Sequence, residues 1–336
     1  MIQFSPPPDQ PVYFNNRTSS YYVPNAHVFE PRDIAAVQAA LSTRRPLLLR
    51  GEPGVGKSQL AMAAAIVLRR VYVQHVVNAL TEPNDILWHE DAVRRLADAQ
   101  IFNAYGQGPG TISPSSEIAA CDPRVRNNYI APGALWWAFD WETAKDQATK
   151  SAVAELDPPT KECSPQNGVV ILIDEIDKAG AEVPNSLLEA FGSRQFFVPG
   201  RDSPVKTSEE TWPLVIITTN EERILPNAFL RRCVVHDIKL PDDPQKLKSY
   251  LVQRAGAHFG SVTDRNEAYE AAAEMLIEDR VLAKSKQWEP LPGLAEYLDL
   301  LRAVEDISFG DAMEQVRKLE QLKDFFYRKH PESKDG

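Results

Sequence analysis

Gly51-Glu52-Pro53-Gly54-Val55-Gly56-Lys57-Ser58 is a glycine-rich stretch between an apolar run at residues 46–50 and a segment of helical composition at residues 59–70. The expected order is therefore strand, loop and helix, which is the context in which this pattern binds phosphate. Glycines let backbone N–H groups turn inward around phosphate oxygens, and the helix N-terminus adds partial positive charge. A chance glycine-rich turn is the alternative, but the spacing and the flanking elements both favour a phosphate-binding loop.

Two side chains of this loop have separate expected roles. Lys57 can reach the β- and γ-phosphates of a nucleotide, and the Ser58 hydroxyl can ligate magnesium. The sequence therefore predicts a nucleotide triphosphate with Mg²⁺ at this loop.

Composition limits the class of protein. The chain has 336 residues, of which 43% are hydrophobic and 25% are charged, as is ordinary for a soluble globular protein of one large or two modest domains. The net charge is −10 and no run of five basic residues occurs, which makes a nucleic-acid partner less expected.

Three sparse cysteines, Cys121, Cys163 and Cys233, have no C-x-x-C spacing. They indicate a reducing compartment and no metal cluster. No apolar run has membrane-spanning length, and the proline-rich N-terminus lacks a signal pattern. We therefore expect a cytoplasmic protein with no membrane insertion.

Buried strands alternate with helical segments up to about residue 240, which predicts a parallel α/β sheet. The expected strands are residues 46–50, 71–77, 169–173, 213–219 and 234–240. Helices are expected at residues 86–104, 134–139 and 183–191, and a hairpin is expected around the Pro-Gly turn at residues 199–200. After the break at residues 241–244 all segments have a helical pattern. We expect an extended arm (1–28), an αβα nucleotide-binding domain (29–240) and a smaller all-α lid (241–336).

The segment VVILIDEIDK at residues 169–178 is a buried strand that ends in two carboxylates. Such a strand delivers Asp174 and Glu175 to the carboxyl edge of the sheet, where ligands bind in folds of this class. Asp174 is expected to hold magnesium, and Glu175 to orient and polarise the attacking water. A solvated acidic turn is the alternative.

These motifs together define the expected site. The expected nucleotide-binding residues are Gly51, Glu52, Pro53, Gly54, Val55, Gly56, Lys57, Ser58, Gln59 and Asp174, and the expected metal ligands are Ser58 and Asp174.

Three more side chains are candidates for catalysis. Asn220 follows an apolar strand, where its amide can hydrogen-bond the γ-phosphate and the attacking water, although a turn asparagine is equally consistent. Arg231 and Arg232 end a short helical segment, and an arginine that reaches a phosphate of a neighbouring subunit stabilises transition-state charge. From spacing alone, a surface ion pair is the simpler interpretation of these arginines.

The order of these motifs resembles that of AAA+ ATPases, with Walker A, Walker B, sensor 1 and an arginine finger. The chain is similar in particular to the MoxR-type branch, in the segments at residues 46–58, 80–85, 129–136, 173–179, 187–198 and 225–233. The resemblance implies a five-stranded αβα P-loop domain with a helical lid, ATP and Mg²⁺ as cofactors, and assembly as a homo-oligomeric ring, usually a hexamer.

The branch also implies particular insertions and partners. An insertion in helix 2 corresponds to about residues 100–130, and a hairpin before sensor 1 corresponds to residues 196–213. Relatives remodel or mature protein clients, often with a partner that carries a von Willebrand factor A domain. Tyr105 in the insertion is either a pore-loop aromatic or a buried anchor.

The chain departs from many relatives at sensor 2, where residues 291–296 contain no arginine. Either Lys284 or Lys286 substitutes, or the lid senses the γ-phosphate poorly. An ATP-driven motor is therefore the first hypothesis, and a slow ATP-dependent switch or scaffold is the second. A DNA-acting motor and a small-molecule kinase are less favoured, and no guanine-reading motif supports a GTPase.

Overall fold

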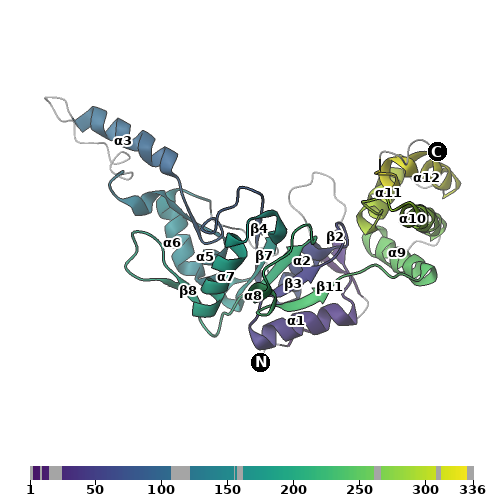
Figure 1. Ribbon diagram of the computed structural model, residues 1–336, viewed down its shortest axis with the longest axis horizontal. Helices are drawn as coiled ribbons and strands as arrows, with labels where there is room; N and C mark the ends of the chain where they lie inside the picture. Colours follow the sequence, from purple (N-terminus) through teal and green to yellow (C-terminus); the bar gives the residue numbers. More distant parts are fainter. Residues whose placement is uncertain are drawn as a thin grey trace. The chain divides into compact units, whose positions relative to one another are not determined.

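The computed structural model describes residues 3–7, 10–14, 25–106, 122–154, 156, 162–260, 266–307 and 312–330. Within these residues, the main sheet has five parallel strands in the order β11-β3-β10-β7-β4 (Figure 1). The strands are β3 (Leu47–Arg50), β4 (Val71–Val76), β7 (Val169–Asp174), β10 (Leu214–Thr219) and β11 (Val234–Asp237). The predicted α/β class and its five strands are confirmed.

The central strands are apolar at nearly every position. All six residues of β10 and the first five of β7 are buried. A strand covered on both faces needs apolar side chains at consecutive positions, which explains why these segments do not alternate. In the register, Val170 of β7 pairs with Leu214 of β10, and Asp174 pairs with Val76 of β4.

The chain forms two compact units, each assembled from segments that are distant in sequence. Among the described residues, unit 1 comprises 38–48 and 64–235, and unit 2 comprises 3–37, 49–63 and 236–330. Helices α1 (Pro31–Thr43) and α2 (Lys57–Val67) contribute residues to both. The domain boundary near residue 240 stays a prediction.

In unit 1, a short aromatic helix covers the sheet. A helix was predicted at the residues of α5 (Ala134–Phe139), and the structure shows that all of them are buried and that α5 packs on β4 and β7. The helix α6 (Trp141–Ser151), which follows directly, has no counterpart among the expected helices. The Asp140 side chain caps α6 by accepting a hydrogen bond from the Thr143 N–H.

The remaining elements of unit 1 are the helix α7 (Glu182–Ser193), the short helix α8 (Asn227–Leu230), and the 3₁₀ turns η1 (Arg126–Tyr129), η2 (Pro165–Asn167) and η3 (Ile176–Lys178). A hairpin of β8 (Gln195–Phe196) and β9 (Val205–Lys206) lies around the predicted Pro-Gly turn.

The helix expected at residues 86–104 begins later than predicted. Residues Trp88–Glu90 form the strand β5, which pairs antiparallel with β6 (Ile130–Pro132). The helix α3 (Ala92–Gly106) starts only after Asp91, whose carboxylate accepts a hydrogen bond from the Arg94 N–H. Pairing with a strand about 40 residues away overrides the local helical pattern. In Figure 1, α3 projects from the rest of unit 1.

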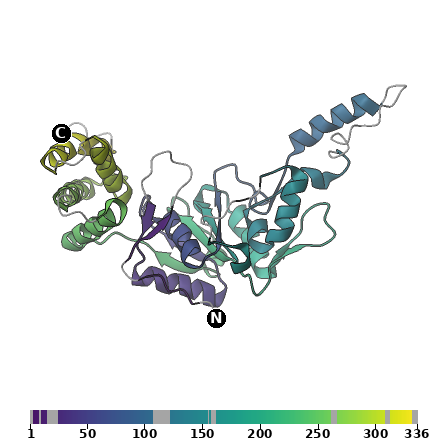
Figure 2. The ribbon, with the colours of Figure 1, turned by 180° about the vertical axis from the view of Figure 1, so that it is seen from behind.

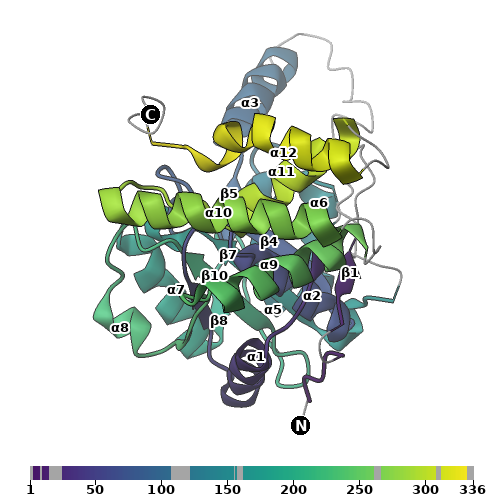
Figure 3. The same cartoon turned by 90° about the vertical axis from the view of Figure 1, so that its right-hand side faces the viewer.

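Unit 2 contains a small hairpin and a helical bundle. The hairpin joins β1 (Val12–Phe14) and β2 (Asn25–His27) in the segment expected to be an extended arm. Among the described residues, the bundle has four helices, which are α9 (Pro244–Phe259), α10 (Asn266–Lys286), α11 (Leu294–Ile307) and α12 (Ala312–Tyr327). Figure 3 shows α9 beside α10, and Figure 2 shows the bundle from another side.

Buried tyrosines join the helices of this bundle. The Tyr297 hydroxyl on α11 donates to the backbone carbonyl of Tyr269 on α10, and the Tyr327 hydroxyl on α12 donates to that of Ala272. Both phenols lie in an apolar core, where a hydroxyl needs a hydrogen-bond partner.

Candidate functional site

The glycine-rich loop lies between β3 and α2, as predicted, and its backbone needs glycine. Gly51, Gly54 and Gly56 all have positive φ angles, of 150°, 79° and 96°. A Cβ at Gly51 would stand 2.2 Å from the carbonyl oxygen of Ile238, so this position excludes every side chain. Ile238, the residue after β11, is held close to the loop by a hydrogen bond from its N–H to the Arg50 carbonyl.

Lys57, the first residue of α2, holds its ammonium inside the loop. The residue is only 7% exposed, and its Nζ donates to the carbonyl oxygens of Gly51 at 2.7 Å and Glu52 at 3.0 Å. A buried ammonium needs such acceptors because it has left water. The loop thus presents a cation at the N-terminus of a helix, which is a suitable site for an anion.

A cavity of about 170 Å³ lies next to the loop within unit 2. Its walls come from the segment after β2, from Val55 of the loop, from the end of β11 and from α9. A cavity of about 150 Å³ is large enough for a benzene ring. The cavity can therefore accept a planar heteroaromatic ring.

Polar and cation–π contacts hold the walls of this cavity. Asp33 accepts hydrogen bonds from the Glu30 N–H at 2.9 Å and contacts His236 Nε2 at 2.7 Å. Burial alone would raise the pKa of Asp33, but the hydrogen bonds from His236 and Glu30 outweigh it and lower that pKa. The Arg254 guanidinium stacks over the Tyr250 ring at 4.6 Å.

His27 lies beside the loop as a neutral imidazole. Its Nδ1 is 4.0 Å from the position that a Cβ of Gly56 would occupy, and its Nε2 has no hydrogen-bond partner among the described residues. Burial, reinforced by the charge of Arg254, lowers the pKa of His27 to about 3. A neutral ring with an unpaired nitrogen suits contact with an uncharged heteroaromatic group.

The lid also contacts the loop within unit 2. Arg280 of α10 pairs with the Glu52 carboxylate, and Ala295 of α11 lies where a Cβ on Gly54 would be only 2.7 Å away. Lys284, one of the residues considered for sensor 2, pairs with Asp242 at 3.3 Å. Arg280 was not among the predicted site residues, because no pattern in a helical interior marks a residue that contacts a loop 228 positions earlier.

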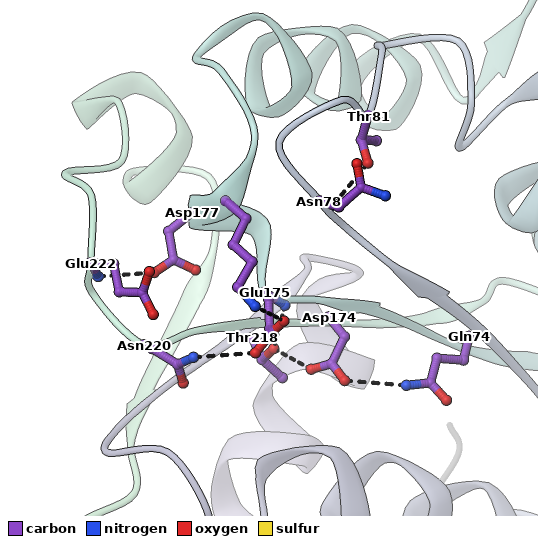
Figure 4. Close-up of polar contacts among 10 residues, drawn as sticks. Gln74, Asn78, Thr81, Asp174, Glu175, Asp177, Thr218, Asn220 and Glu222 are labelled. Atoms are coloured by element: carbon purple, nitrogen blue, oxygen red, sulfur yellow. Dashed lines mark hydrogen bonds and ion pairs between the residues drawn. The ribbon is translucent and has the colours of Figure 1, made fainter. Parts of the chain in front are cut away.

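In unit 1, Asp174 at the end of β7 is held by side chains of both neighbouring strands (Figure 4). The Thr218 hydroxyl of β10 donates to one carboxylate oxygen at 2.5 Å, and the Gln74 amide of β4 donates to the other at 3.1 Å. Thr218 is fully buried and also accepts a hydrogen bond from the Glu175 N–H at 2.8 Å. One hydroxyl therefore sets the positions of both acidic residues.

Glu175 has a left-handed backbone with φ of 60°, and the structure brings it together with Asn220. Its carboxylate contacts the Asn220 amide at 3.4 Å and the Lys178 ammonium at 2.5 Å. The hydrogen bond to Glu175 raises the pKa of Lys178. The carboxylate is thus oriented between a neutral donor and a cation, as Figure 4 shows for Asn220.

The turn that carries Asn220 is anchored to the acidic segment. Asp177 is buried and accepts a hydrogen bond from the Glu222 N–H at 2.9 Å, and Arg223 donates to the Lys178 carbonyl at 3.2 Å. Asn220 was predicted from its place after an apolar strand, but the contacts that position it were not. Gln74, Thr218, Asp177 and Lys178 carry no local signal for these roles.

Arg231 and Arg232 follow α8 and are both exposed. Within the described ranges, no hydrogen bond or ion pair joins either guanidinium to another residue. The structure therefore does not bring them to the acidic pair of their own unit. The side chain of Tyr105 and residues 107–121 of the predicted insertion lie outside the described residues. No helix in the described part of the chain is long and apolar enough to cross a membrane.

Comparisons with known proteins identify the family of the matched segment. The family model of the AAA domain (dynein-related subfamily) matches residues 46–233, which is more than half of the 336 residues. The matched segment includes the glycine-rich loop, the acidic pair, Asn220 and both arginines. A comparison with curated proteins found no match.

Among solved structures, the chain is similar to a crystal structure, at 2.00 Å resolution, of a presumptive ATPase from Cytophaga hutchinsonii. The two are 13% identical, the match covers 89% of this chain and 80% of the other, and the TM-score is 0.37.

Proposed function

The chain belongs to the AAA domain family, dynein-related subfamily, and from this premise we propose that it is a Mg²⁺-dependent ATPase of the MoxR type that remodels a protein client. The observation that carries the proposed hydrolysis is the Glu175 carboxylate, which contacts Asn220 beside the firmly held Asp174. A carboxylate and an amide at the end of adjacent strands are suitable to orient a water for attack on a γ-phosphate.

The proposed nucleotide is held by unit 2. The backbone N–H groups of residues 51–59 and the Lys57 ammonium bind the phosphates, and the base enters the cavity beside Val55 and Tyr250. This assignment accounts for both the cation inside the loop and the adjacent space for a planar ring. ATP is the proposed nucleotide because no guanine-reading motif occurs.

The proposed metal is magnesium. Ser58 and Asp174 offer hydroxyl and carboxylate oxygens, which are the ligand types that Mg²⁺ prefers. When bound, the ion neutralises charge on the β- and γ-phosphates. Thr218 and Gln74 hold the Asp174 carboxylate by its two oxygens, so that it keeps one orientation.

In the proposed reaction, Glu175 orients the attacking water and draws its proton, and Asn220 steadies both the carboxylate and the water. Lys178 limits the positions that Glu175 can adopt. Arg232, with Arg231 as its neighbour, supplies positive charge to the site of the adjacent subunit in a ring, which we propose to be a hexamer. Both arginines are exposed and have no side-chain partner among the described residues, which supports this role.

The MoxR assignment and client remodelling rest on two features. The hairpin β8–β9 precedes β10, where the branch has its inserted hairpin, and α3 extends into the segment at about residues 100–130 that corresponds to the helix-2 insertion. We propose that these elements contact a protein client, with a von Willebrand factor A domain protein as partner, in the cytoplasm. The sequence contains no run of basic residues that would favour DNA as the client.

A slow ATP-dependent switch is the second candidate function. It is favoured by the ion pair of Glu175 with Lys178, which engages the water-orienting carboxylate. A motor and a switch differ in turnover, because a motor hydrolyses ATP continuously when its client is present.

The proposed function is tested by phosphate release from MgATP by the full chain and by its Glu175→Gln variant. We expect hydrolysis to fall roughly a thousand-fold in the variant while ATP binding stays unchanged, since only the water-orienting carboxylate is lost. The ATP-loaded variant is then used to capture its partner, which is added back to the wild type. Stimulated turnover supports the motor, unchanged slow turnover supports the switch, and absence of ATP binding overturns both.

A further inference from the structure

Glu52 places a negative charge in a loop whose proposed ligand is a polyanion. Its carbonyl oxygen accepts a hydrogen bond from the Lys57 ammonium at 3.0 Å, so the residue belongs to the wall that surrounds the phosphate-binding cation. A carboxylate here opposes phosphate binding, because like charges in proximity repel each other. The loop therefore needs a device that neutralises this charge or turns it away.

The structure contains such a device in the lid helix α10. One terminal nitrogen of Arg280 donates to both carboxylate oxygens of Glu52 at 2.8 Å, and the other donates to the carbonyl oxygen of Pro292 at 2.7 Å. The Arg280 side chain is 8% exposed, whereas that of Glu52 is 45% exposed. The guanidinium is thus fixed from two directions, and the carboxylate is directed toward the lid.

The start of α11 completes this contact. Gly293 and Ala295 follow the Pro292 carbonyl that Arg280 binds, and Ala295 lies directly against Gly54 of the loop. The Gly293 N–H is in turn held by the Glu296 carboxylate at 3.0 Å. A single arginine therefore connects one side of the loop, the middle of α10 and the beginning of α11.

We propose that Arg280 is a positioning residue of the nucleotide site, which neutralises Glu52 and holds its carboxylate on the lid so that the loop accepts a polyphosphate. The proposal rests on the proposed binding of ATP at this loop. It has a consequence for regulation: the loop has high affinity for nucleotide only while α10 is docked on it. The lid is then coupled to nucleotide binding through Glu52, with no arginine at the start of α11.

Three variants of the full chain test this inference: Arg280→Met, Glu52→Gln and the double variant. Affinities for MgADP and for the slowly hydrolysed analogue Mg·ATPγS are measured by calorimetry. Arg280→Met exposes an unneutralised carboxylate and is expected to weaken ATPγS binding on the order of ten-fold, and ADP binding less, because ADP carries less charge. The double variant is expected to recover affinity to within about two-fold of wild type, since the repelling charge is gone.

A measurement at high salt and the substitution of a second arginine provide the controls. The loss in Arg280→Met should shrink at about 0.5 M NaCl, because salt screens the repulsion. Arg328→Met removes a different arginine that pairs with α10, through Asp279, and should leave nucleotide affinity unchanged. Melting curves verify that each variant is folded.

The alternatives predict different patterns. If Arg280 were only a structural anchor, or if it contacted phosphate itself, Glu52→Gln would not restore affinity to Arg280→Met, and the inference would be overturned. If Arg280→Met does not fold, Glu52→Gln alone decides: unchanged or tighter binding supports charge neutralisation, and weaker binding contradicts it. Lys57→Ala serves as reference. A wild type that binds no nucleotide refutes the proposed function, whereas a binding wild type with unaffected variants refutes only this inference.

Discussion

The glycine-rich loop of unit 2 and the acidic edge of unit 1 hold their charged groups in different ways. In the loop, the Lys57 ammonium is bound by carbonyls five and six residues earlier in the chain. At the acidic edge, Asp174 is bound by side chains 44 and 100 residues away. The Lys57 ammonium is therefore held by the backbone of its own loop, whereas the acidic residues are held by side chains that only the formed sheet brings together. Substitutions should affect the two regions differently.

The largest effect is expected from Lys57→Ala. The loop loses its only side-chain ammonium among residues 51–59, and its carbonyls gain no other donor, so ATP affinity should fall on the order of a hundred-fold or more. Calorimetry with MgATP measures the loss. Because the ammonium joins carbonyls of the same loop and no distant segment, the melting temperature should change little. Unchanged affinity would contradict the assignment of the loop.

Arg232→Ala tests whether the acidic edge is completed by another chain. We expect ATP hydrolysis to fall by about 10³-fold, the low end for such arginines, with ATP binding retained. Mixing this variant with Lys57→Ala should restore part of the activity, because a Lys57→Ala subunit still offers its arginine to a neighbour with an intact loop.

The mixing experiment needs a check of assembly. Light scattering or cross-linking should confirm that mixed rings form, and recovery should peak near equal proportions. Absence of recovery in confirmed mixed rings would argue for an arginine that acts within its own chain. If Arg231→Ala, and not Arg232→Ala, restores activity when it is mixed with Lys57→Ala, the ring model holds and Arg231 is the arginine that acts on the neighbouring site.

Thr218→Val is expected to have a smaller effect on activity than Lys57→Ala or Arg232→Ala and is the most specific test of the acidic edge. The exchange keeps the shape but removes the donor to Asp174 and the acceptor of the Glu175 N–H. An unpaired buried N–H costs about 1–3 kcal/mol, so we expect roughly ten-fold slower hydrolysis and a lower melting temperature. ATP binding through the loop should persist.

The neighbouring threonine provides the control for this exchange. Thr219 is equally buried, but its hydroxyl accepts a hydrogen bond from the Glu221 N–H and contacts neither acidic residue. Thr219→Val should therefore slow hydrolysis less than Thr218→Val. Equal effects would mean that the end of β10, rather than the Thr218 hydroxyl, organises the acidic pair.

Local patterns were sufficient for much of the fold. The loop between β3 and α2, the buried strands β7 and β10, and the aromatic helix α5 were all predicted, because backbone turns and runs of apolar residues depend on neighbours within a few positions. The acidic pair at the end of β7 was located by the same reasoning. The predicted start of α3 was wrong, because Trp88–Glu90 pairs with a strand about 40 residues away.

The contacts that give the candidate site its chemistry depend on the packed chain. Thr218 reaches Asp174 across 44 residues, and Arg280 reaches Glu52 across 228. A threonine in an apolar strand and an arginine in a helix are ordinary in sequence, and only the sheet register and the docking of α10 give them partners. The cavity beside Val55 likewise has walls from four separate segments of unit 2. The sequence by itself determined which side chains can carry the chemistry, because these motifs depend on residues that are close together in the chain. Only the tertiary structure decided how those side chains are oriented, because their partners come from distant segments.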